Sequence, residues 1–598
     1  MNHVVATAGH VDHGKSTLVR ALTGIEPDRW AEEKRRGLTI DLGFAWTTLP
    51  SGREVSFVDV PGHERFLGNM LAGLGPAPVV CFVVAVDEGW QAQSSDHRDA
   101  VAALGITRGV IVLSRIDKAP DLVEAVTREV RRELADTGLR DAPVAAVSAV
   151  DGTGLDQLRD TLDRVLAQNP VPHADQRVRL WVDRAFSIKG AGTVATGTLG
   201  SGALAVGQSL TVISETSTSV TIRGLQSHKS TTDQLLATTR AAVNLRGVSA
   251  GEINRGDVLV TPGAWPTTQE FDLHRTTGPA FTQVPSEVVL HVGSAGIPAH
   301  LRPFDDHHAR LRIERHIPVI PGDRVILRYP AAEVVLGGGR ILDINPYPLS
   351  RRGDSARHTA WLRTLPDDGD ASSLVIRHGA VSRAHLMQLG LLAQADSTPD
   401  SPEVQEVAGW WIHQAELTRW VDTVRAEVAT IHARSPMAPG MAVGAVPELL
   451  GITDSALVKA VIGKSGLTQN GGYLAHRDHQ PDLGPAELGL QALEKHLAVN
   501  PFDSPEAHDL TRWGLGSREL ATAERLGRIV RVGGGVVVLP NAPALAMREL
   551  ARLEQPFTAS QARLALGTTR RVAIPLLEHL DARGWTQRVD GTRRTIRR

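Results

Sequence analysis

The chain has 598 residues, which is too long for one hydrophobic core and predicts about four to six domains. A hydrophobic content of 42% and a charged content of 22% are ordinary for globular protein, and a net charge of −2 excludes a polycation. Any affinity for nucleic acid must therefore be local. The single cysteine, Cys81, excludes an intrachain disulfide framework and a cysteine-based zinc cluster. Its apolar surroundings, VVCFVV, predict a buried strand.

The N-terminus begins with a strand-like run and lacks the basic and then apolar pattern of a signal peptide. No apolar run reaches the length of about 18 residues that a membrane-spanning helix needs. We therefore expect a cytoplasmic protein without membrane contact.

The octet GHVDHGKS at residues 9–16 fits the phosphate-binding pattern G-x-x-x-x-G-K-[ST]. It follows the strand-like run Val4–Thr7 and precedes the helix-like run Leu18–Leu22, as a P-loop does. Its glycines let backbone N–H groups turn toward phosphates, and the helix N-terminus adds the positive end of a dipole. We expect Lys15 to neutralise the β- and γ-phosphates and Ser16 to bind Mg²⁺. The predicted nucleotide contacts of this loop are Asp12, His13, Gly14, Lys15, Ser16 and Thr17.

Apolar runs alternate with helical patterns through the first 170 residues, which predicts a doubly wound α/β domain. The strand-like runs are 55–60, 79–86 and 109–113, and the helical patterns are 95–104 and 121–137.

Two further segments would sense the γ-phosphate. In the motif DVPG, Asp59 would reach Mg²⁺ through water, and Gly62 lets the backbone turn toward the phosphate. Thr39 lies between the P-loop and this motif, and its hydroxyl would complete the Mg²⁺ shell only when the γ-phosphate is present. The Thr39 loop and the Gly62 loop would thus be ordered in one state and released in the other. His63 would orient the attacking water, as a glutamine does in other GTPases.

The segment SRID predicts which base is bound. Asp117 would accept two hydrogen bonds from the N1–H and 2-amino groups of guanine, and adenine lacks that pair. Ser114 and Arg115 replace the Asn and Lys of the usual N-K-x-D motif. The arginine stem would still stack on the base, whereas the serine has a shorter reach. Ser148 and Ala149 fit the last base-contacting loop, where a backbone N–H meets the guanine O6.

Together, GHVDHGKS, RGLTI and DVPGH resemble the translational GTPases of the elongation factor Tu type. The resemblance implies a GTPase domain over residues 1–170 that binds GTP or GDP with Mg²⁺ and is stimulated by the ribosome. It also implies that His63 is catalytic, that Val11 and Leu38 form an apolar gate beside it, and that Asp12 helps to polarise the water.

After the segment NPVP, short alternating runs with glycine turns predict two β-barrels, over residues 173–265 and 269–347. The run FSIKGAGTVATGT at 186–198 resembles the second domain of the same family, and 310–328 with Pro346 resembles its third. This organisation implies a carrier of an aminoacyl-tRNA or of initiator tRNA.

Asp183 and Arg184, in DRAF, resemble the selenocysteine-specific elongation factors, in which an Asp-Arg pair and a further Arg line the amino-acid pocket. Arg240 matches the further Arg by its setting in TRAAVNL. A selenol is largely anionic at neutral pH whereas a serine hydroxyl is neutral, so two guanidiniums in a dry pocket favour the selenolate. The residues alone leave open a surface ion pair between Asp183 and Arg184.

Residues 350–598 predict tandem winged-helix domains. A helix–turn–helix pattern at 449–461 is followed by two strand-like pieces, and the same plan recurs at 518–539 and 557–596. A fainter unit lies at about 372–418. The units share the same predicted order of helices and strands, but their amino-acid sequences are not similar.

The last unit, about 552–598, is the basic one, with nine Arg and three acidic residues from Phe557 to Arg598. A helix start and a basic wing at the Asp590–Gly591 turn would clamp a nucleic-acid backbone. A solvated C-terminal face is the alternative. In selenocysteine-specific factors this tail binds an mRNA hairpin, which the resemblance extends to this chain. The candidate RNA-binding residues are Gln561, Arg563, Arg570, Arg571, Arg588, Arg593 and Arg594.

We therefore predict a multidomain α/β, β and α fold: a P-loop GTPase domain, two β-barrels and tandem winged helices. The resemblance to bacterial selenocysteine-specific elongation factors implies a monomer that delivers selenocysteyl-tRNA to the ribosome at in-frame UGA codons marked by an mRNA hairpin. One alternative is a GTPase that carries general or initiator tRNA. Another is a GTP-controlled nucleic-acid-binding regulator that delivers no amino acid.

Overall fold

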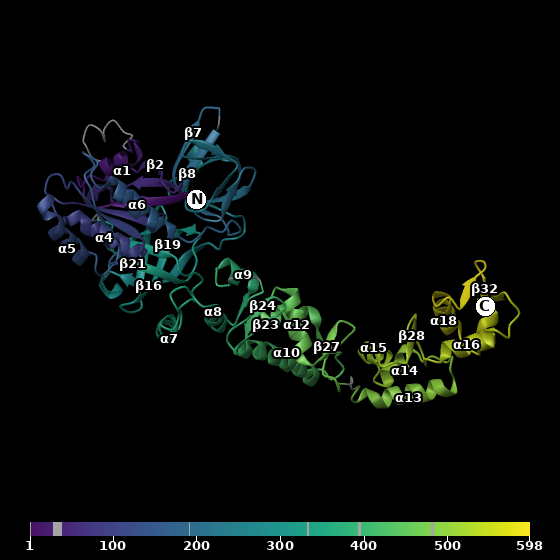
Figure 1. The fold of residues 1–598 in the computed structure, drawn as a ribbon. Helices are drawn as coiled ribbons and strands as arrows, with labels where there is room; N and C mark the ends of the chain where they lie inside the picture. Colours follow the sequence, from purple (N-terminus) through teal and green to yellow (C-terminus); the bar gives the residue numbers. More distant parts are fainter. Residues whose placement is uncertain are drawn as a thin grey trace. The chain divides into compact units, whose positions relative to one another are not determined.

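A computed structural model describes residues 2–27, 39–190, 192–331, 334–392, 396–479 and 483–597 (Figure 1). The chain divides into two compact units, Met1–Ser401 and Pro402–Arg598. The first unit holds an α/β domain, two β-barrels and a short helical segment, and the second holds winged helices. Among the described helices, none is long and apolar enough to cross a membrane.

The α/β domain is built on a six-stranded sheet with the order β2-β3-β1-β4-β5-β6, in which β2 alone among the described strands runs antiparallel. Helices α3, α4 and α5 cover one face and α1 and α6 the other, so strands β4 and β5 are buried throughout. The strands are β1 (Asn2–Ala8), β2 (Gly43–Thr48), β3 (Glu54–Asp59), β4 (Val79–Ala85), β5 (Gly109–Ser114) and β6 (Val144–Ala146). The helices are α1 (Lys15–Thr23), η1 (Glu64–Phe66), α3 (Leu67–Leu74), α4 (Ala92–Leu104), η2 (Pro120–Leu122), α5 (Val123–Glu133) and α6 (Leu155–Ala167).

The doubly wound prediction is therefore confirmed, together with each strand-like run and helical pattern behind it. Cys81 lies inside β4 and is 1% exposed, as its apolar surroundings predicted. Burial raises the pKa of its thiol to about 12, so this cysteine is a packing residue and not a nucleophile.

Barrel one follows, with strands in the order β10-β15-β7-β8-β14-β11-β12 and a β10–β11 pairing that closes the ring. Buried residues alternate along β14, which places one face of the strand in the barrel core. The strands of this sheet are β7 (Arg179–Ile188), β8 (Gly192–Ser201), β10 (Ser209–Ile213), β11 (Ser217–Ser227), β12 (Ser230–Thr232), β14 (Thr239–Arg246) and β15 (Val258–Val260). Strands β9 (Ala203–Ala205) and β13 (Gln234–Leu236) pair in a separate two-stranded sheet, and η3 (Ala250–Glu252) is a short helix.

Barrel two is a closed six-stranded barrel with the order β16-β19-β18-β17-β20-β21. Strict alternation along β18 shows the period of two that half-buried strands require. The strands are β16 (Thr268–Thr277), β17 (Glu287–Val292), β18 (Ala295–Pro303), β19 (His308–Ile317), β20 (Arg324–Arg328) and β21 (Val335–Asp343), with the short helix η4 (Phe281–Gln283).

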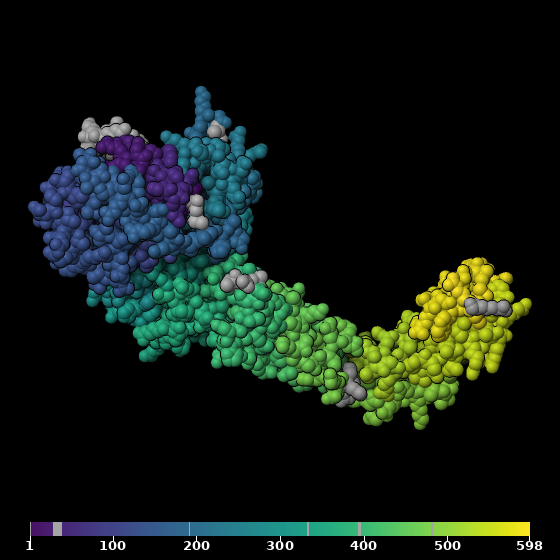
Figure 2. All heavy atoms as spheres, in the orientation of Figure 1, coloured from purple at the N-terminus to yellow at the C-terminus, as the bar shows by residue number. Residues whose placement is uncertain are grey.

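Both barrels contact the α/β domain. Helix α4 packs on barrel two, where a methyl group added at Gly338 would lie 2.7 Å from the Cα of Ala103. At barrel one, the Thr238 hydroxyl donates to the Asn2 carbonyl at 2.8 Å. Figure 2 shows the purple atoms of the α/β domain against the blue atoms of barrel one along this boundary. The three domains therefore form a continuous packed body.

The first unit ends in α7 (Asp354–Leu362), α8 (Ala371–His378), β22 (Ala380–Ser382) and α9 (Arg383–Gln388). A buried charge cluster ties this segment to barrel two. His358 of α7 contacts the Asp272 carboxylate at 2.6 Å, and Arg310 donates to both oxygens of the same carboxylate, at 2.8 and 3.2 Å. Asp272 and His358 are both 0% exposed.

The Asp272→Asn substitution is expected to destabilise the first unit by roughly 3–5 kcal/mol, because it leaves the buried Arg310 guanidinium with only the distant, partly exposed Glu270 carboxylate at 3.9 Å. Thermal unfolding of the full chain should show the first unit's transition lowered by on the order of 10 °C. Glu124→Gln is the control, because it removes an exposed ion pair with Arg128 and should shift the transition by about 2 °C or less. Equal transitions in the two variants would contradict the expectation.

The second unit begins with the hairpin β23 (Val404–Val407) and β24 (Trp410–His413) and then shows the predicted winged-helix plan three times. The first of these has α10 (Gln414–Arg434), β25 (Met441–Ala442), η5 (Val443–Ala445), α11 (Val446–Leu450), α12 (Ser455–Ser465), β26 (Thr468–Asn470) and β27 (Tyr473–Ala475). The next has α13 (Ala486–Val499), α14 (Ala507–Arg512), α15 (Ser517–Arg525), β28 (Val530–Gly533) and β29 (Val536–Val538). The last has α16 (Ala542–Leu550), β30 (Phe557–Thr558), α17 (Ala559–Ala565), α18 (Arg570–Ala582), β31 (Thr586–Arg588) and β32 (Arg593–Ile596).

Candidate functional site

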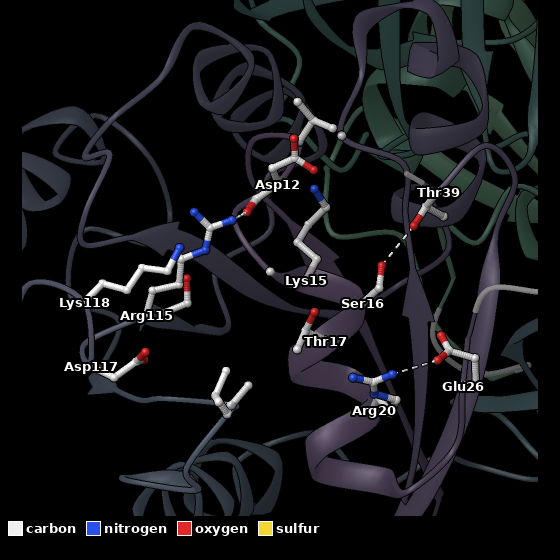
Figure 3. Close-up of a pocket in the computed structure, with 16 residues that line it drawn as sticks. Asp12, Lys15, Ser16, Thr17, Arg20, Glu26, Thr39, Arg115, Asp117 and Lys118 are labelled. Atoms are coloured by element: carbon white, nitrogen blue, oxygen red, sulfur yellow. Dashed lines mark hydrogen bonds and ion pairs between the residues drawn. The ribbon is translucent and has the colours of Figure 1, made fainter. Parts of the chain in front are cut away.

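A cavity of about 570 Å³ opens at the carboxyl ends of β1, β3 and β5 (Figure 3). Ligands of open α/β sheets bind at this edge, where the connecting loops diverge. The lining residues are Val11, Asp12, Gly14, Lys15, Ser16, Thr17, Arg20, Glu26, Thr39, Gly62, Ser114, Arg115, Asp117, Lys118, Ala149 and Val150.

The P-loop backbone forms one wall of this cavity. Asp12 and Gly14 have positive φ angles of 61° and 82°, a conformation that turns successive N–H groups toward an anion. Gly14 is also the N-cap of α1, so the positive end of that helix dipole lies beside it. A methyl group at Gly9 would lie 2.1 Å from the Val83 carbonyl oxygen, so the loop passes over β4 only with glycine. The wall is suited to phosphate.

Lys15 lies at this wall with its side chain buried. Its Nζ donates to the carbonyl oxygens of Gly9 at 2.9 Å and His10 at 2.7 Å, and the residue is 6% exposed. Burial lowers the pKa of the ammonium to about 8. A polyphosphate beside it would supply the negative charge that this desolvated cation lacks.

Oxygen ligands for a divalent cation meet next to Lys15. The hydroxyls of Ser16 and Thr39 lie 2.9 Å apart, and Asp59, at the end of β3, accepts a hydrogen bond from the Thr7 hydroxyl at 2.8 Å. In the described part of the chain, no three His, Cys, Asp or Glu side chains gather as a metal site. Two hydroxyls and one carboxylate fit Mg²⁺, which keeps several waters and shares substrate phosphates.

The part of the cavity predicted to bind the guanine base has Ser114 and Arg115 in place of the Asn and Lys of the N-K-x-D motif. Both residues still form hydrogen bonds with the P-loop. The Ser114 hydroxyl donates to the His13 carbonyl at 2.7 Å, so the short side chain still ties β5 to the phosphate loop. Arg115 donates to Glu88 at 2.5 Å and to the Asp12 carbonyl. Its guanidinium therefore braces the loop, and its stem remains beside the exposed Asp117.

The last predicted base-contacting loop is only partly in the cavity. Ala149 lines it, whereas Ser148 is 0% exposed and its hydroxyl accepts from the Asp151 N–H at 3.4 Å. Val150 lines the cavity instead and is 85% exposed as a side chain. Sequence reasoning missed Val150 and Lys118, although each directly follows a residue that it did select.

His63 lies beside the cavity and does not line it. Its Nδ1 accepts a hydrogen bond from the Arg65 N–H at 3.2 Å, and its ring contacts that of Phe66 at a centroid distance of 6.1 Å. In a neutral ring this leaves the proton on Nε2. Gly62 and Val11 do line the cavity, and a methyl group at Gly62 would lie 2.6 Å from the Val11 nitrogen. Leu38, the other predicted gate residue, lies outside the described residues.

A buried histidine that the sequence did not identify, His97, supports the P-loop from beneath, and His13 and His3 are buried in the same domain. The Gly9 N–H donates to His97 Nδ1 at 3.1 Å, and burial lowers the pKa of His97 well below its usual value. Burial likewise lowers the pKa of His13 to about 3 and that of His3 in β1 to about 4. His13 is 0% exposed and, unlike Asp12 and Gly14, does not line the cavity, so its predicted nucleotide contact stays a prediction.

These lowered pKa values predict acid destabilisation of the α/β domain. In unfolded chain a histidine titrates near pH 6.5, so the unfolded state takes up the proton first and stability is lost as pH falls from about 6.5 toward 4. His3→Gln should make the slope of the melting temperature against pH shallower in that interval. His300→Gln, with a 57% exposed side chain, should leave the slope unchanged. Identical slopes in the wild type and both variants would rule out this contribution.

A second cavity of about 250 Å³ lies between β2, β3 and barrel one. Arg184 and Arg240 line it, with guanidinium carbons 5.5 and 4.2 Å from the centroid of the Phe44 ring. The other lining residues are Ala45, Trp46, Ser56, Phe57, Phe186, Thr196, Gln226, Ser227, His228, Lys229, Ala241 and Ala242.

Asp183 lies behind this cavity and holds one of its arginines. It is 5% exposed, accepts from the Thr196 hydroxyl at 2.8 Å and is ion-paired with Arg240. Arg184 pairs with Asp41 at 3.1 Å instead. The residues predicted for the aminoacyl pocket thus come together, but Asp183 and Arg184 have different partners.

In the last winged helix, the predicted RNA-binding residues divide into exposed and structural ones. Arg570 and Arg593 are exposed, at the start of α18 and at the wing. Arg594 is 6% exposed and donates to Asp581 at 2.8 Å. Arg571 is exposed, but its guanidinium donates to the Ser504 carbonyl of the preceding winged helix. Arg563 is half-buried, Gln561 forms the capping box of α17, and Arg588 contacts Glu578 at 3.3 Å.

Comparison with protein families agrees with this domain order. A model of the elongation factor Tu GTP binding domain matches residues 2–168, and one of elongation factor Tu domain 2 matches 192–260. The beta-barrel domain of selenocysteine-specific elongation factors matches 277–348, and a winged helix of elongation factor SelB matches 548–595. The fold and the first cavity thus define a translational GTPase with two barrels and C-terminal winged helices.

Comparison with relatives over nearly their full length shows which family of translational GTPases the chain belongs to. The chain is 32% identical to the selenocysteine-specific elongation factor of Escherichia coli (strain K12), over 98% of this chain and 97% of that protein. It is 30% identical to that of Desulfomicrobium baculatum, over 100% and 99%. The chain belongs to the family of selenocysteine-specific elongation factors.

Solved structures share the fold. The crystal structure of a bacterial selenocysteine-specific elongation factor EF-Sec covers 100% of both chains, with a TM-score of 0.79 and 25% identity. Elongation factor SelB from Methanococcus maripaludis, in complex with the GTP analogue GppNHp, matches 58% of this chain and 80% of that chain, with a TM-score of 0.51 and 24% identity.

Proposed function

We propose that this protein binds selenocysteyl-tRNA in its GTP state and delivers it to the ribosome at in-frame UGA codons, guided by an mRNA hairpin. It acts as a cytoplasmic monomer and resets by hydrolysing GTP. The observation that carries the proposal is the second cavity, where two arginines converge on one aromatic ring.

The first cavity performs the switching reaction. Lys15 and the P-loop N–H groups hold the β- and γ-phosphates, and Asp117 selects guanine. Ser16 and Thr39, with Asp59 through water, would hold Mg²⁺, which neutralises phosphate charge. His63 turns toward the γ-phosphate and orients the attacking water, with Asp12 polarising it and Val11 and Leu38 flanking it. Loss of the γ-phosphate removes the partner of the Thr39 and Gly62 loops.

The second cavity discriminates by charge. The charge of Arg240 is partly neutralised by Asp183, and that of Arg184 by Asp41. Arg255 adds a third guanidinium, which contacts the Asp41 carboxylate and the Asp183 carbonyl. These three guanidiniums and two carboxylates sum to +1, and the Lys229 ammonium, which also lines the cavity, adds a further positive charge. A selenolate would be attracted by this excess of positive charge, whereas a serine hydroxyl brings no charge to the cavity.

The test compares selenocysteyl-tRNA and seryl-tRNA on the same tRNA, with the full-length protein and a non-hydrolysable GTP analogue. We expect selenocysteyl-tRNA to bind at least about tenfold more tightly. Equal affinity would favour the alternative of a general or initiator tRNA carrier. Equal affinity for charged and uncharged tRNA would favour a GTP-controlled regulator that binds nucleic acid and delivers no amino acid.

For hairpin recognition we propose the exposed surface formed by Arg570 at the start of α18 and by Arg588 and Arg593 at the wing, with Gln561 and Arg563 beside them. Arg594 and Arg571 are left out, because their guanidiniums hold Asp581 and the Ser504 carbonyl. Arg594 would support the surface from behind, and Arg571 would tie it to the preceding winged helix.

A gel shift of the full-length protein with the hairpin of a selenoprotein message tests this surface. The Arg570→Ala and Arg593→Ala double variant should bind at least about tenfold more weakly, with a salt slope reduced by about one per arginine. Arg548→Ala removes a 66% exposed arginine of α16 and should bind as the wild type does. Unchanged binding by the double variant would move the RNA site elsewhere.

A further inference from the structure

Asp41 lies where the Thr39 loop meets barrel one. It stands between Thr39 and β2, and its carboxylate accepts hydrogen bonds from Arg184 at 3.1 Å and from Arg255 at 2.7 Å. Its side chain is 21% exposed. Two arginines on a partly shielded carboxylate make a stronger contact than a solvated surface pair.

Arg255 extends this contact to α3, the helix that comes after the Gly62 loop and η1. Its Nη1 donates to Asn69 Oδ1 at 2.5 Å, and Asn69 belongs to α3, which follows that loop. The Asn69 amide nitrogen donates to the Ile40 carbonyl at 2.9 Å, and Arg255 Nε donates to the Asp183 carbonyl at 2.9 Å. One guanidinium therefore connects α3, Asp41 and the backbone behind the second cavity.

The other end of the contact is the cavity itself. Arg184 lines it beside Phe44, and Phe44 belongs to β2, three residues after Asp41. Arg240 is ion-paired with Asp183 within barrel one, and it contacts the described α/β domain at the Phe44 ring. The Arg184 guanidinium is held by the α/β domain, through Asp41 and the Leu42 carbonyl at 3.4 Å.

Asp41 is also close to the nucleotide cavity, through Thr39. The Thr39 hydroxyl lies 2.9 Å from that of Ser16 in the P-loop, and Thr39 is 8% exposed. Two peptide units separate Thr39 from Asp41, a span of at most about 7 Å. A displacement of Thr39 from the P-loop is therefore transmitted to Asp41 with little slack.

We propose that Asp41 is a positioning residue that places Arg184 at the wall of the aminoacyl cavity only while Thr39 is held at the P-loop. Asp41 is also connected, through Arg255 and Asn69, to α3, the helix that follows the Gly62 loop. Movements of both nucleotide-sensing loops would therefore act on the position of Arg184. This inference rests on the proposed function of the second cavity, and it adds the residue through which the nucleotide state acts on that cavity.

The proposed coupling can be measured as an effect of the nucleotide on tRNA binding or as an effect of the tRNA on nucleotide binding. If GTP favours selenocysteyl-tRNA by some factor over GDP, selenocysteyl-tRNA must favour GTP over GDP by the same factor. Removing the Asp41 carboxylate should lower both factors together. A residue that only stabilises the fold would not change this ratio, because it affects the two nucleotide states alike.

The experiment measures the Kd of the full-length protein for selenocysteyl-tRNA with GDP and with a non-hydrolysable GTP analogue. Asp41→Asn should lower the ratio of the two constants about tenfold, and Arg255→Gln should do the same. The double variant should lose no more than either single one, since the two residues form one connection. If Asp41→Asn fails to bind nucleotide and to fold, Arg255→Gln decides the outcome.

Asp323→Asn is the matched control. Asp323 has a side-chain exposure of 15% and pairs with Arg179 of barrel one at 2.6 Å, but it belongs to barrel two and its carboxylate forms no hydrogen bond or ion pair with the described residues of either loop. Its variant should keep the wild-type ratio. A wild-type ratio in both Asp41→Asn and Arg255→Gln would overturn the inference. Failure of the wild-type protein to prefer selenocysteyl-tRNA over seryl-tRNA would instead overturn the proposed function.

Discussion

Lys15→Ala is expected to weaken GTP and GDP binding by about 100-fold or more, the largest effect of any single change in the first cavity. The ammonium is desolvated and held by two loop carbonyls, so its charge acts on the phosphates at full strength. Alanine removes the charge and leaves these two carbonyls without their donor. Titration with a fluorescent guanine nucleotide measures the change.

Arg20→Ala is the matched control for this prediction. Arg20 lines the same cavity, but its side chain is 58% exposed and pairs with Glu26 at 3.2 Å (Figure 3). Solvent screens such a cation, so its removal should change nucleotide affinity by about fivefold or less. A Lys15→Ala affinity within this same range would show that the cavity holds phosphate through its backbone alone.

His63→Ala is expected to lower the kcat of ribosome-stimulated GTP hydrolysis by about 10²- to 10⁴-fold, the range of a positioned acid–base group. Nucleotide affinity should stay near the wild-type value, because His63 does not line the cavity. With Nδ1 accepting from the Arg65 N–H, the Nε2–H edge is the one available for the attacking water or phosphate. Single-turnover hydrolysis of labelled GTP separates this step from binding.

The His63→Gln variant tests whether orienting the water accounts for part of the effect of His63. A glutamine orients water without acid–base chemistry, so this variant should retain more hydrolysis than His63→Ala. Arg65→Ala, which changes an exposed neighbour but keeps the backbone N–H that donates to His63, should hydrolyse GTP as the wild type does. A kcat for His63→Ala within threefold of the wild type would remove His63 from the mechanism.

Local motifs determined the α/β domain from sequence. Octet 9–16 predicted the P-loop because strand, glycine turn and helix are consecutive in the chain. Alternating runs likewise predicted both barrels, and the Asp590–Gly591 turn predicted the wing of the last winged helix. Each of these features depends on neighbours within a few residues, which is the distance over which sequence patterns report structure.

Side-chain partners across domains were decided only by the tertiary structure. Sequence patterns marked Arg184 as a pocket residue but gave no sign of Asp41, which lies 143 positions away and holds its guanidinium. They grouped Arg594 with the exposed wing arginines, although packing buries it against Asp581. An arginine looks the same in sequence whether it is solvated, structural or ligand-binding. What separates these roles is the burial and the countercharge that distant segments bring to it when the chain folds.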